Sequence, residues 1–207
     1  MRSGIRTWVR GAGVALLVVA VAAPVAGATP ADTQGRPGMI DVADLPPDSL
    51  TWMGGASDEP GGSYTPTCLW DRINEVPEQN TWSADFFTSE TAAAVERVFV
   101  LPTEAEAVTL AESLRQYYAA CADRLRAAYP GDTVTGQDHG SLDVEEGATV
   151  GGVHRSRTSP WASYNNHLYG VGRDGSTVAV VEWESNWTQP DVPAFKETVR
   201  AAVNKLY

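Results

Sequence analysis

Two stretches of the chain carry apolar residues at the three- and four-residue spacing of an amphipathic helix. The first begins at Thr103-Glu104-Ala105-Glu106, a capping sequence in which a hydroxyl and a carboxylate can satisfy free amides at a helix N-terminus. The second begins at Asp191, with Pro193 in its first turn. The apolar positions are Ala107, Leu110, Ala111, Leu114, Tyr117, Tyr118, Cys121 and Leu125 in the first helix, and Phe195, Val199, Ala202, Val203 and Leu206 in the second. Each helix therefore has one face to bury.

Strands are predicted before and between these helices. Apolar and β-branched residues favour strands over residues 93–101 and 148–157, and a clearer pair covers residues 164–173 and 176–186. The order of strand, helix, strands, hairpin and helix indicates an α+β fold. We expect an antiparallel sheet with the helices packed on one of its faces, as a two-layer α/β sandwich.

The closing hairpin predicts a candidate ligand site. A turn at Asp174-Gly175, the strongest two-residue hairpin signal, would pair His167 with Glu182 and Asn165 with Glu184 on one face of the sheet. A histidine beside a carboxylate can change its charge near neutral pH. The alternative is a solvent-exposed cross-strand pair without a function. The predicted ligand-binding residues are Asn165, His167, Glu182 and Glu184, with Tyr169 and Trp183 as wall residues of a cleft.

The first 28 residues have the pattern of a signal peptide. Arg2, Arg6 and Arg10 form a positive segment, residues 14–23 are apolar, and Ala26-Gly27-Ala28 is a small-residue cleavage site. The apolar run is shorter than the roughly 20 residues of a spanning helix, which argues against a membrane anchor. We therefore expect cleavage after Ala28 and secretion.

The remainder is expected to be one acidic domain. Residues 29–39 have the composition of a flexible leader, and residues 40–207 have the length of a single domain. Ile40 to Leu45 is apolar enough to lie against the body of that domain. Loss of three arginines on cleavage would lower the formal net charge from -11 to -14. This charge argues against a nucleic-acid binder, because phosphate neutralisation requires clustered lysine and arginine, and it disfavours docking on anionic lipid.

Cys68 and Cys121 are the only cysteines, and an oxidising compartment favours a disulfide between them. The alternative is two buried thiols. With no further cysteine, a multi-cysteine zinc site is excluded, and the histidines and carboxylates lack the spacing of zinc or calcium sites. We therefore expect no metal and no cofactor.

Motifs for catalysis are missing from the sequence. Ser141 follows His139 closely but lies in no Gly-x-Ser-x-Gly motif, and the adjacent acids Glu145-Glu146 are typical of a solvated loop. We therefore expect no enzymatic activity. Trp161 and Trp187, near one another at the open end of the hairpin, leave a carbohydrate-binding module as an alternative, and core packing is the other interpretation of such aromatics.

Several runs together resemble the PknH-like extracellular sensor domains of actinobacteria. These runs are Ala93-Ala94-Val95-Glu96-Arg97-Val98-Phe99, Ala105-x-Ala107-x-x-Leu110-Ala111-x-x-Leu114-Arg115, Tyr118-Ala119-Ala120-Cys121, Asn165-Asn166 and the helix Phe195 to Leu206. The resemblance covers roughly residues 40–207 and implies a bent antiparallel sheet with helices and a cleft for an external ligand. The family has no established catalytic residue. This sequence differs from kinase-linked members in its single cysteine pair and its lack of a kinase segment, so any signalling is expected to need a separate partner.

These observations predict a secreted, non-enzymatic sensor or binding domain. It would hold an extracellular small molecule or a cell-envelope component in a cleft. The alternatives are an interaction module for another secreted or membrane protein, a cell-wall carbohydrate-binding module and, with least support, a hydrolase.

Overall fold

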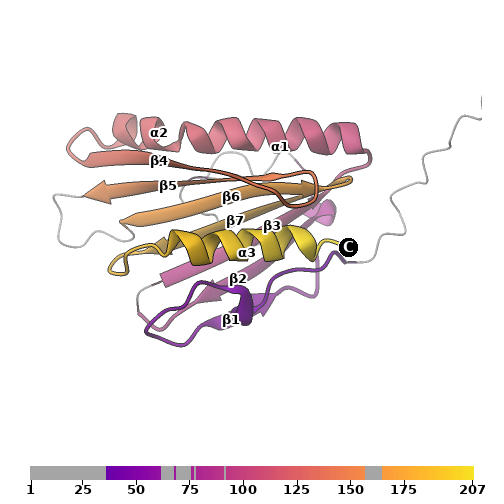
Figure 1. Cartoon of the computed structure of the whole chain (residues 1–207), viewed down its shortest axis with the longest axis horizontal. Helices are drawn as coiled ribbons and strands as arrows, with labels where there is room; N and C mark the ends of the chain where they lie inside the picture. The colour runs from indigo at the N-terminus through magenta and orange to yellow at the C-terminus, as the bar shows by residue number, and fades with distance from the viewer. Residues whose placement is uncertain (1–35, 62–67, 69–75, 77, 91, 157–164) are drawn as a thin grey trace, which may run out of the picture.

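The computed structural model describes residues 36–61, 68, 76, 78–90, 92–156 and 165–207. These residues form a seven-stranded antiparallel sheet with three α-helices (Figure 1), so the predicted α+β class is confirmed. The sheet order is β1-β2-β3-β7-β6-β5-β4. The strands are β1 Met53–Ala56, β2 Thr81–Phe87, β3 Ala92–Val100, β4 Thr133–Leu142, β5 Ala148–Ser156, β6 Asn166–Asp174 and β7 Thr177–Ser185; the helices are α1 Glu104–Ala119, α2 Cys121–Ala128 and α3 Val192–Asn204.

The segment expected to direct export lies outside the described residues, as do Trp161 and most of the predicted leader. In the described part of the chain, no helix combines the length and the apolar character needed to cross a membrane.

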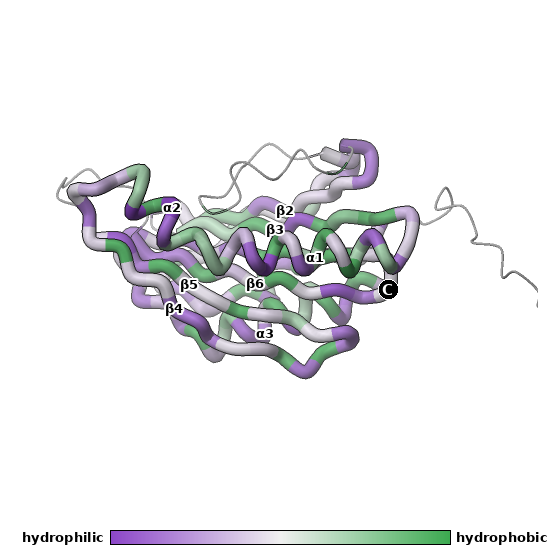
Figure 2. Tube along the Cα trace, turned by 90° about the horizontal axis from the view of Figure 1, so that it is seen from above, coloured by the Kyte–Doolittle hydropathy of each residue, from purple (hydrophilic) through white to green (hydrophobic). Residues whose placement is uncertain are grey.

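The helices cover both faces of the sheet, which corrects the prediction of a two-layer sandwich. Successive strand residues point to opposite faces. On β6, a Cβ atom added to Gly170 would lie 2.4 Å from Val199 of α3, whereas the next residue, Val171, belongs to the core cluster beneath α1. Every residue of β7 is buried, as expected for a central strand covered on both sides. Figure 1 shows α3 in front of the strands, and Figure 2 shows α1 and α3 apart when the molecule is seen from above.

The layer on the α3 side includes the start of the described chain. Ile40 and Leu45 are buried in the same core cluster as Phe195 and Leu206, which confirms that this segment lies against the domain. The Thr198 hydroxyl donates a hydrogen bond to the Asp44 carbonyl oxygen over 2.6 Å. The predicted helix start is also confirmed, because the Asp191 side chain accepts a hydrogen bond from the Ala194 amide.

The layer on the other face contains α1, α2 and the disulfide. Cys68 and Cys121 are bonded, with their Cα atoms 5.6 Å apart, as the sequence predicted. The single helix expected from Thr103 onward is interrupted at Ala120. Thr103 caps α1 by accepting from the Glu106 amide, but the Glu106 carboxylate accepts from the Thr103 hydroxyl, so only half of the predicted capping box forms. Figure 2 shows the alternation of hydrophilic and hydrophobic turns along α1.

The closing hairpin has a register two residues away from the predicted one. Its loop is Gly175-Ser176, with Asp174 paired to Thr177. Gly175 has a φ of +53°, the conformation that a type II′ turn requires at its first loop residue and that glycine adopts readily. Glycine therefore occupies the first loop position of the turn, whereas the prediction placed it at the second. Because the shift is even, the predicted faces are kept while the predicted partners change.

Candidate functional site

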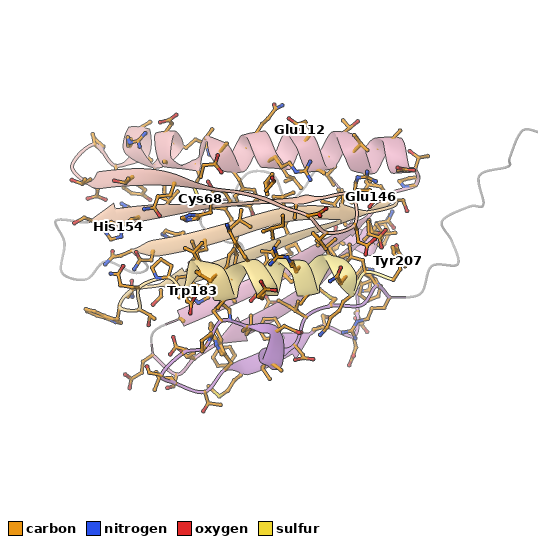
Figure 3. All side chains as sticks on the ribbon, in the orientation of Figure 1. Cys68, Glu112, Glu146, His154, Trp183 and Tyr207 are labelled. Atoms are coloured by element: carbon orange, nitrogen blue, oxygen red, sulfur yellow. A yellow bond between two sulfur atoms is a disulfide. The ribbon has the colours of Figure 1, made fainter. Side chains whose placement is uncertain are left out.

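The predicted site residues are only partly brought together, and most of them are buried. His167 faces Glu184 rather than Glu182, with its Nδ1 atom 3.4 Å from Oε1 of Glu184. Glu182 faces Tyr169 on the same surface of the sheet. Asn165 precedes β6 and is half-buried, and Trp183 lies in the core beside α3, on the opposite face (Figure 3). The structure therefore corrects both the predicted pairing and the place of Trp183 in the site.

Two predicted carboxylates belong to a cluster of buried ionisable side chains between the sheet and α1. The Tyr118 hydroxyl of α1 donates a hydrogen bond to Oε1 of Glu182. Nη2 of Arg97, on β3, lies 3.6 Å from Oδ1 of Asp85, on β2. We call the buried members of this group the buried polar cluster; they are Arg97, Tyr118, His167, Glu182 and Glu184.

Burial governs the ionisation of this cluster. Burial raises the pKa of Glu182 well above its usual range, and the charge of Glu184 adds to the shift. Burial and the charge of Glu182 likewise raise the pKa of Tyr118, so its hydroxyl keeps its proton as a donor. Glu182 and Glu184 are each only 1% exposed. They therefore lie in the closed interior of the protein and do not form the wall of a cleft.

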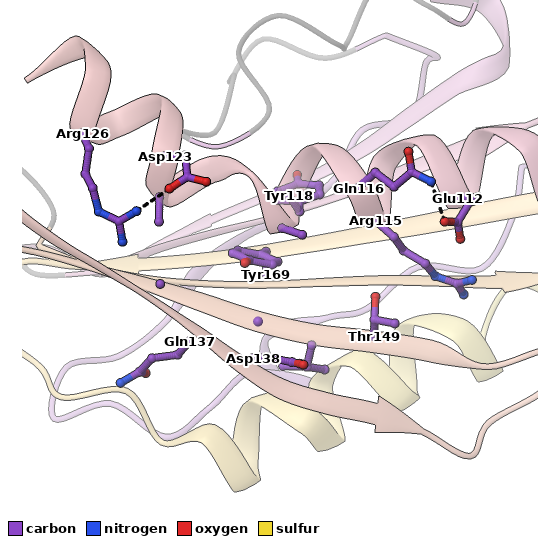
Figure 4. A pocket seen from close by; sticks show the side chains of 15 residues that line it. Glu112, Arg115, Gln116, Tyr118, Asp123, Arg126, Gln137, Asp138, Thr149 and Tyr169 are labelled. Carbon is purple, nitrogen blue, oxygen red and sulfur yellow. Dashed lines mark hydrogen bonds and ion pairs between the residues drawn. The ribbon is translucent and has the colours of Figure 1, made fainter.

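An accessible cavity of about 580 Å³ lies beside this cluster, between α1–α2 and the strands β4 and β5 (Figure 4). We call it the helix–sheet groove. Its helix side is formed by residues spaced three or four apart, so that they share one face. These residues include Glu112, Arg115, Ala119, Ala122, Asp123 and Arg126. The groove follows both helices and crosses the break between them.

The floor of the groove depends on glycine residues in the strands. A Cβ atom on Gly151 would lie 2.5 Å from Cε2 of Tyr169, so the tyrosine ring can cover β5 only because residue 151 has no side chain. The Tyr169 ring stacks on Tyr118, with 4.8 Å between the ring centroids. Burial raises the pKa of Tyr169, with smaller contributions from Asp138 and Glu182. The two tyrosines therefore join the groove to the buried polar cluster.

Two arginines connect the helices to the sheet along the groove. Nη2 of Arg115 donates to the Gly147 carbonyl oxygen over 3.1 Å, and Nε of Arg126 donates to the Val134 carbonyl oxygen over 2.9 Å. Arg126 also forms an ion pair with Asp123. The groove thus combines tyrosine, alanine and glycine surfaces with charged and amide side chains, which is the composition of small-molecule sites. In the described part of the chain, no three histidine, cysteine or acidic side chains are grouped as metal ligands.

Among the residues that line this groove, only Tyr169 was a predicted ligand-binding residue. In the sequence, Glu112, Arg115 and Arg126 lie between the apolar positions of the helix, as solvated side chains do, and residues 133–142 of β4 lack apolar alternation. The feature of the sequence that could have indicated the groove is the presence of Gly136 and Gly151, because glycine inside a strand often marks a close approach of another group. Trp187, a candidate sugar platform, is 75% exposed but does not line the groove.

No family model matches the chain, and no curated protein and no solved structure is found to be similar to it. The resemblance to PknH-like sensor domains therefore stays a prediction from the sequence.

Proposed function

We propose that this protein is a secreted, non-enzymatic binding domain that holds a small extracellular molecule in the helix–sheet groove. The observation that carries the proposal is the cavity of about 580 Å³ between α1–α2 and β4–β5. Small-molecule sites have volumes of roughly 300 to 1,000 Å³ and combine apolar walls with a few polar groups. The disulfide and the N-terminal pattern support an exported protein.

The groove replaces the hairpin face as the proposed site, and Tyr169 is the residue they share. His167, Glu182 and Glu184 are enclosed, so a ligand could reach them only by displacing packed side chains. The groove, by contrast, is open and lies at a boundary between layers. A sensor-type role, as the family resemblance implies, would use ligand binding here to change the surface that α1 and α2 present to a separate partner.

Native mass spectrometry of the protein recovered from the medium of its own host tests this proposal. A denatured control gives the mass of the bare chain, and the difference gives the mass of any bound molecule. The groove is blocked by Ala119→Trp, because Ala119 lines the cavity and is exposed. Val108→Trp is the matched control, since Val108 is 47% exposed on the same helix and does not line the cavity.

We expect an adduct on the wild-type protein and on Val108→Trp, and none on Ala119→Trp. An adduct that persists on Ala119→Trp would place the ligand elsewhere and contradict the proposal. A bare mass for all three proteins would also contradict it, and would favour the interaction-module alternative.

A further inference from the structure

The acidic side chains of the helix–sheet groove have partners within the protein. Glu112 accepts a hydrogen bond from Nε2 of Gln116 over 2.7 Å. Asp138 accepts from the Gly140 amide over 2.8 Å, and Asp123 accepts from Arg126. Dashed lines in Figure 4 mark the two contacts made between side chains. Each of these carboxylates has a local donor, so none of them requires a ligand cation.

Arg115 differs from these residues and from Arg126. Its guanidinium donates to the Gly147 carbonyl oxygen, and among the described residues it forms no ion pair with a carboxylate. Its Nε atom is also buried, and it has no hydrogen-bond acceptor among the described residues. A guanidinium has five N–H donors and its planar shape matches carboxylate and phosphate groups. Arg115 is therefore a cation of the groove that lacks an anionic partner in the described structure.

The floor near Arg115 offers hydroxyl groups. Thr149 of β5 and Tyr169 of β6 line the cavity on the sheet side, and Asp138 lines it from β4, the strand next to β5 (Figure 4). Hydroxyl groups both donate and accept hydrogen bonds, and a carboxylate accepts them, so this floor suits a ligand with several hydroxyl groups of its own. Alanine and glycine residues leave room beside these polar groups.

We infer that the groove binds a small hydroxylated molecule carrying a carboxylate or a phosphate, with the anionic group on Arg115 and the hydroxyl groups on the sheet floor. This inference rests on the proposed function. The net charge of -11 disfavours non-specific binding of anions to this protein. A preference for an anionic ligand would therefore report the local effect of Arg115.

Three hexoses that differ at a single carbon provide the test. Glucose, glucuronate and glucose 6-phosphate carry a hydroxymethyl group, a carboxylate and a phosphate ester, respectively, at carbon 6. Chemical-shift changes in NMR titrations of the isotope-labelled mature protein measure the dissociation constant of each sugar. We expect glucuronate or glucose 6-phosphate to bind at least about tenfold more tightly than glucose, because a charge-assisted hydrogen bond to arginine is stronger than a hydrogen bond between neutral groups. Which anion binds more tightly distinguishes a carboxylate from a phosphate ligand.

The variants separate the effect of Arg115 from the effect of the overall charge of the protein. Arg115→Gln is expected to remove the preference for the anion, and Arg115→Lys is expected to keep a part of it, because lysine retains the charge but not the planar pair of donors. Arg200→Gln removes one charge from α3 and is expected to keep the preference, since Arg200 does not line the groove. Thermal unfolding of each variant establishes that it is folded before titration.

The outcomes distinguish this inference from the proposed function. Equal binding of the three sugars, or an adduct in native mass spectrometry without an acidic group, would overturn the inference and leave the groove as the binding site. An adduct with a carboxylate or phosphate that is lost in Arg115→Gln would support the inference even if the hexoses bind weakly. Absence of both an adduct and sugar binding would overturn the inference and the proposed function together.

Discussion

The hydroxyl of Tyr118 donates a hydrogen bond to the carboxylate of Glu182, and this contact joins α1 to β7, the central strand of the sheet. Both side chains are 1% exposed. The Tyr118 ring also stacks on Tyr169, which lines the helix–sheet groove. The same tyrosine therefore holds the helix layer on the sheet, provides a donor to a buried acid and supports the floor of the proposed binding site.

Replacing Tyr118 with phenylalanine is expected to destabilise the protein. The ring would remain packed, but Glu182 would lose a donor at a buried site, and such a loss costs about 1–3 kcal/mol. Urea denaturation of the wild-type protein and of Tyr118→Phe measures this difference in the free energy of unfolding. Tyr129→Phe is the control, because Tyr129 is 45% exposed. If the two variants unfold at the same urea concentration, the hydrogen bond does not stabilise the fold.

A second buried carboxylate, on the other face of the sheet, predicts a dependence of stability on pH. Oε2 of Glu96 accepts a hydrogen bond from the Ile40 amide over 2.8 Å, and Oε1 has no partner among the described residues. Burial raises the pKa of Glu96 from 4.5 to about 8. In the unfolded chain the pKa returns to its usual value, so folding favours the protonated form. This contribution to stability is fully present below about pH 4.5 and is lost as the pH rises towards 8.

Glu96→Gln is expected to remove this part of the pH dependence, because the amide keeps the acceptor for Ile40 and does not ionise. The free energy of unfolding of the variant relative to the wild type should rise between pH 5 and pH 8, by at most about 1.4 kcal/mol per pH unit. Glu197→Gln, at a side chain that is 71% exposed, should show no such rise. A difference between Glu96→Gln and wild type that is constant over this pH range would show that Glu96 does not titrate as inferred.

Features set by neighbouring residues were predictable from the sequence. The caps at Thr103 and Asp191 and the burial of the two helix stripes depend on side chains within a few residues of one another. The Cys68–Cys121 bond followed from the small number of cysteines and the predicted compartment.

The arrangement of the layers depended on contacts that no local pattern reveals. Gly170 and Gly172 lie on β6 where α3 packs directly on the strand. Because glycine has no side chain, these positions show no hydrophobic pattern from which a covering helix could be predicted. The edge strand β4 has mostly exposed, polar residues and a bulge between Asp138 and Gly140, and therefore has no apolar alternation. The prediction of one covered face failed for these reasons.

For the site, only the face of the sheet on which each hairpin residue lies was predictable. An even shift of register kept His167, Glu182 and Glu184 on one face, but it changed their partners. Their burial was not predicted, since carboxylates are usually exposed unless they are paired. It arises because α1, which is distant in sequence, places Tyr118 over Glu182.

Removal of the disulfide is expected to lower stability by a large amount. The bond joins residues 53 positions apart, and in the chain-entropy model a loop of that length contributes about 4 kcal/mol. The double variant Cys68→Ala and Cys121→Ala leaves no unpaired thiol and should unfold at a much lower urea concentration than the wild type. The same loss should follow reduction of the wild-type protein. A loss below about 1 kcal/mol would mean that packing of α2, rather than the bond, restricts this part of the chain.

The floor of the groove yields a prediction that can be tested without knowing the ligand. In Gly151→Ala, the new methyl group would lie 2.5 Å from Cε2 and 2.6 Å from the hydroxyl oxygen of Tyr169. The ring cannot move away freely, because Tyr118 stacks on it and is itself bonded to Glu182. We expect a loss of about 1–3 kcal/mol in the free energy of unfolding, as for other overpacked sites. Gly55→Ala is the control, since nothing lies within 4 Å of a Cβ atom there.

A second substitution separates this clash from other effects of alanine at position 151. In the Gly151→Ala background, Tyr169→Leu removes the ring atoms that the methyl group meets, so the double variant should lose less stability than the sum of the two single variants. A double-mutant cycle from urea denaturation measures that difference. Additive losses would show that Tyr169 does not lie on Gly151 in solution, and the groove would then have a floor different from the one described.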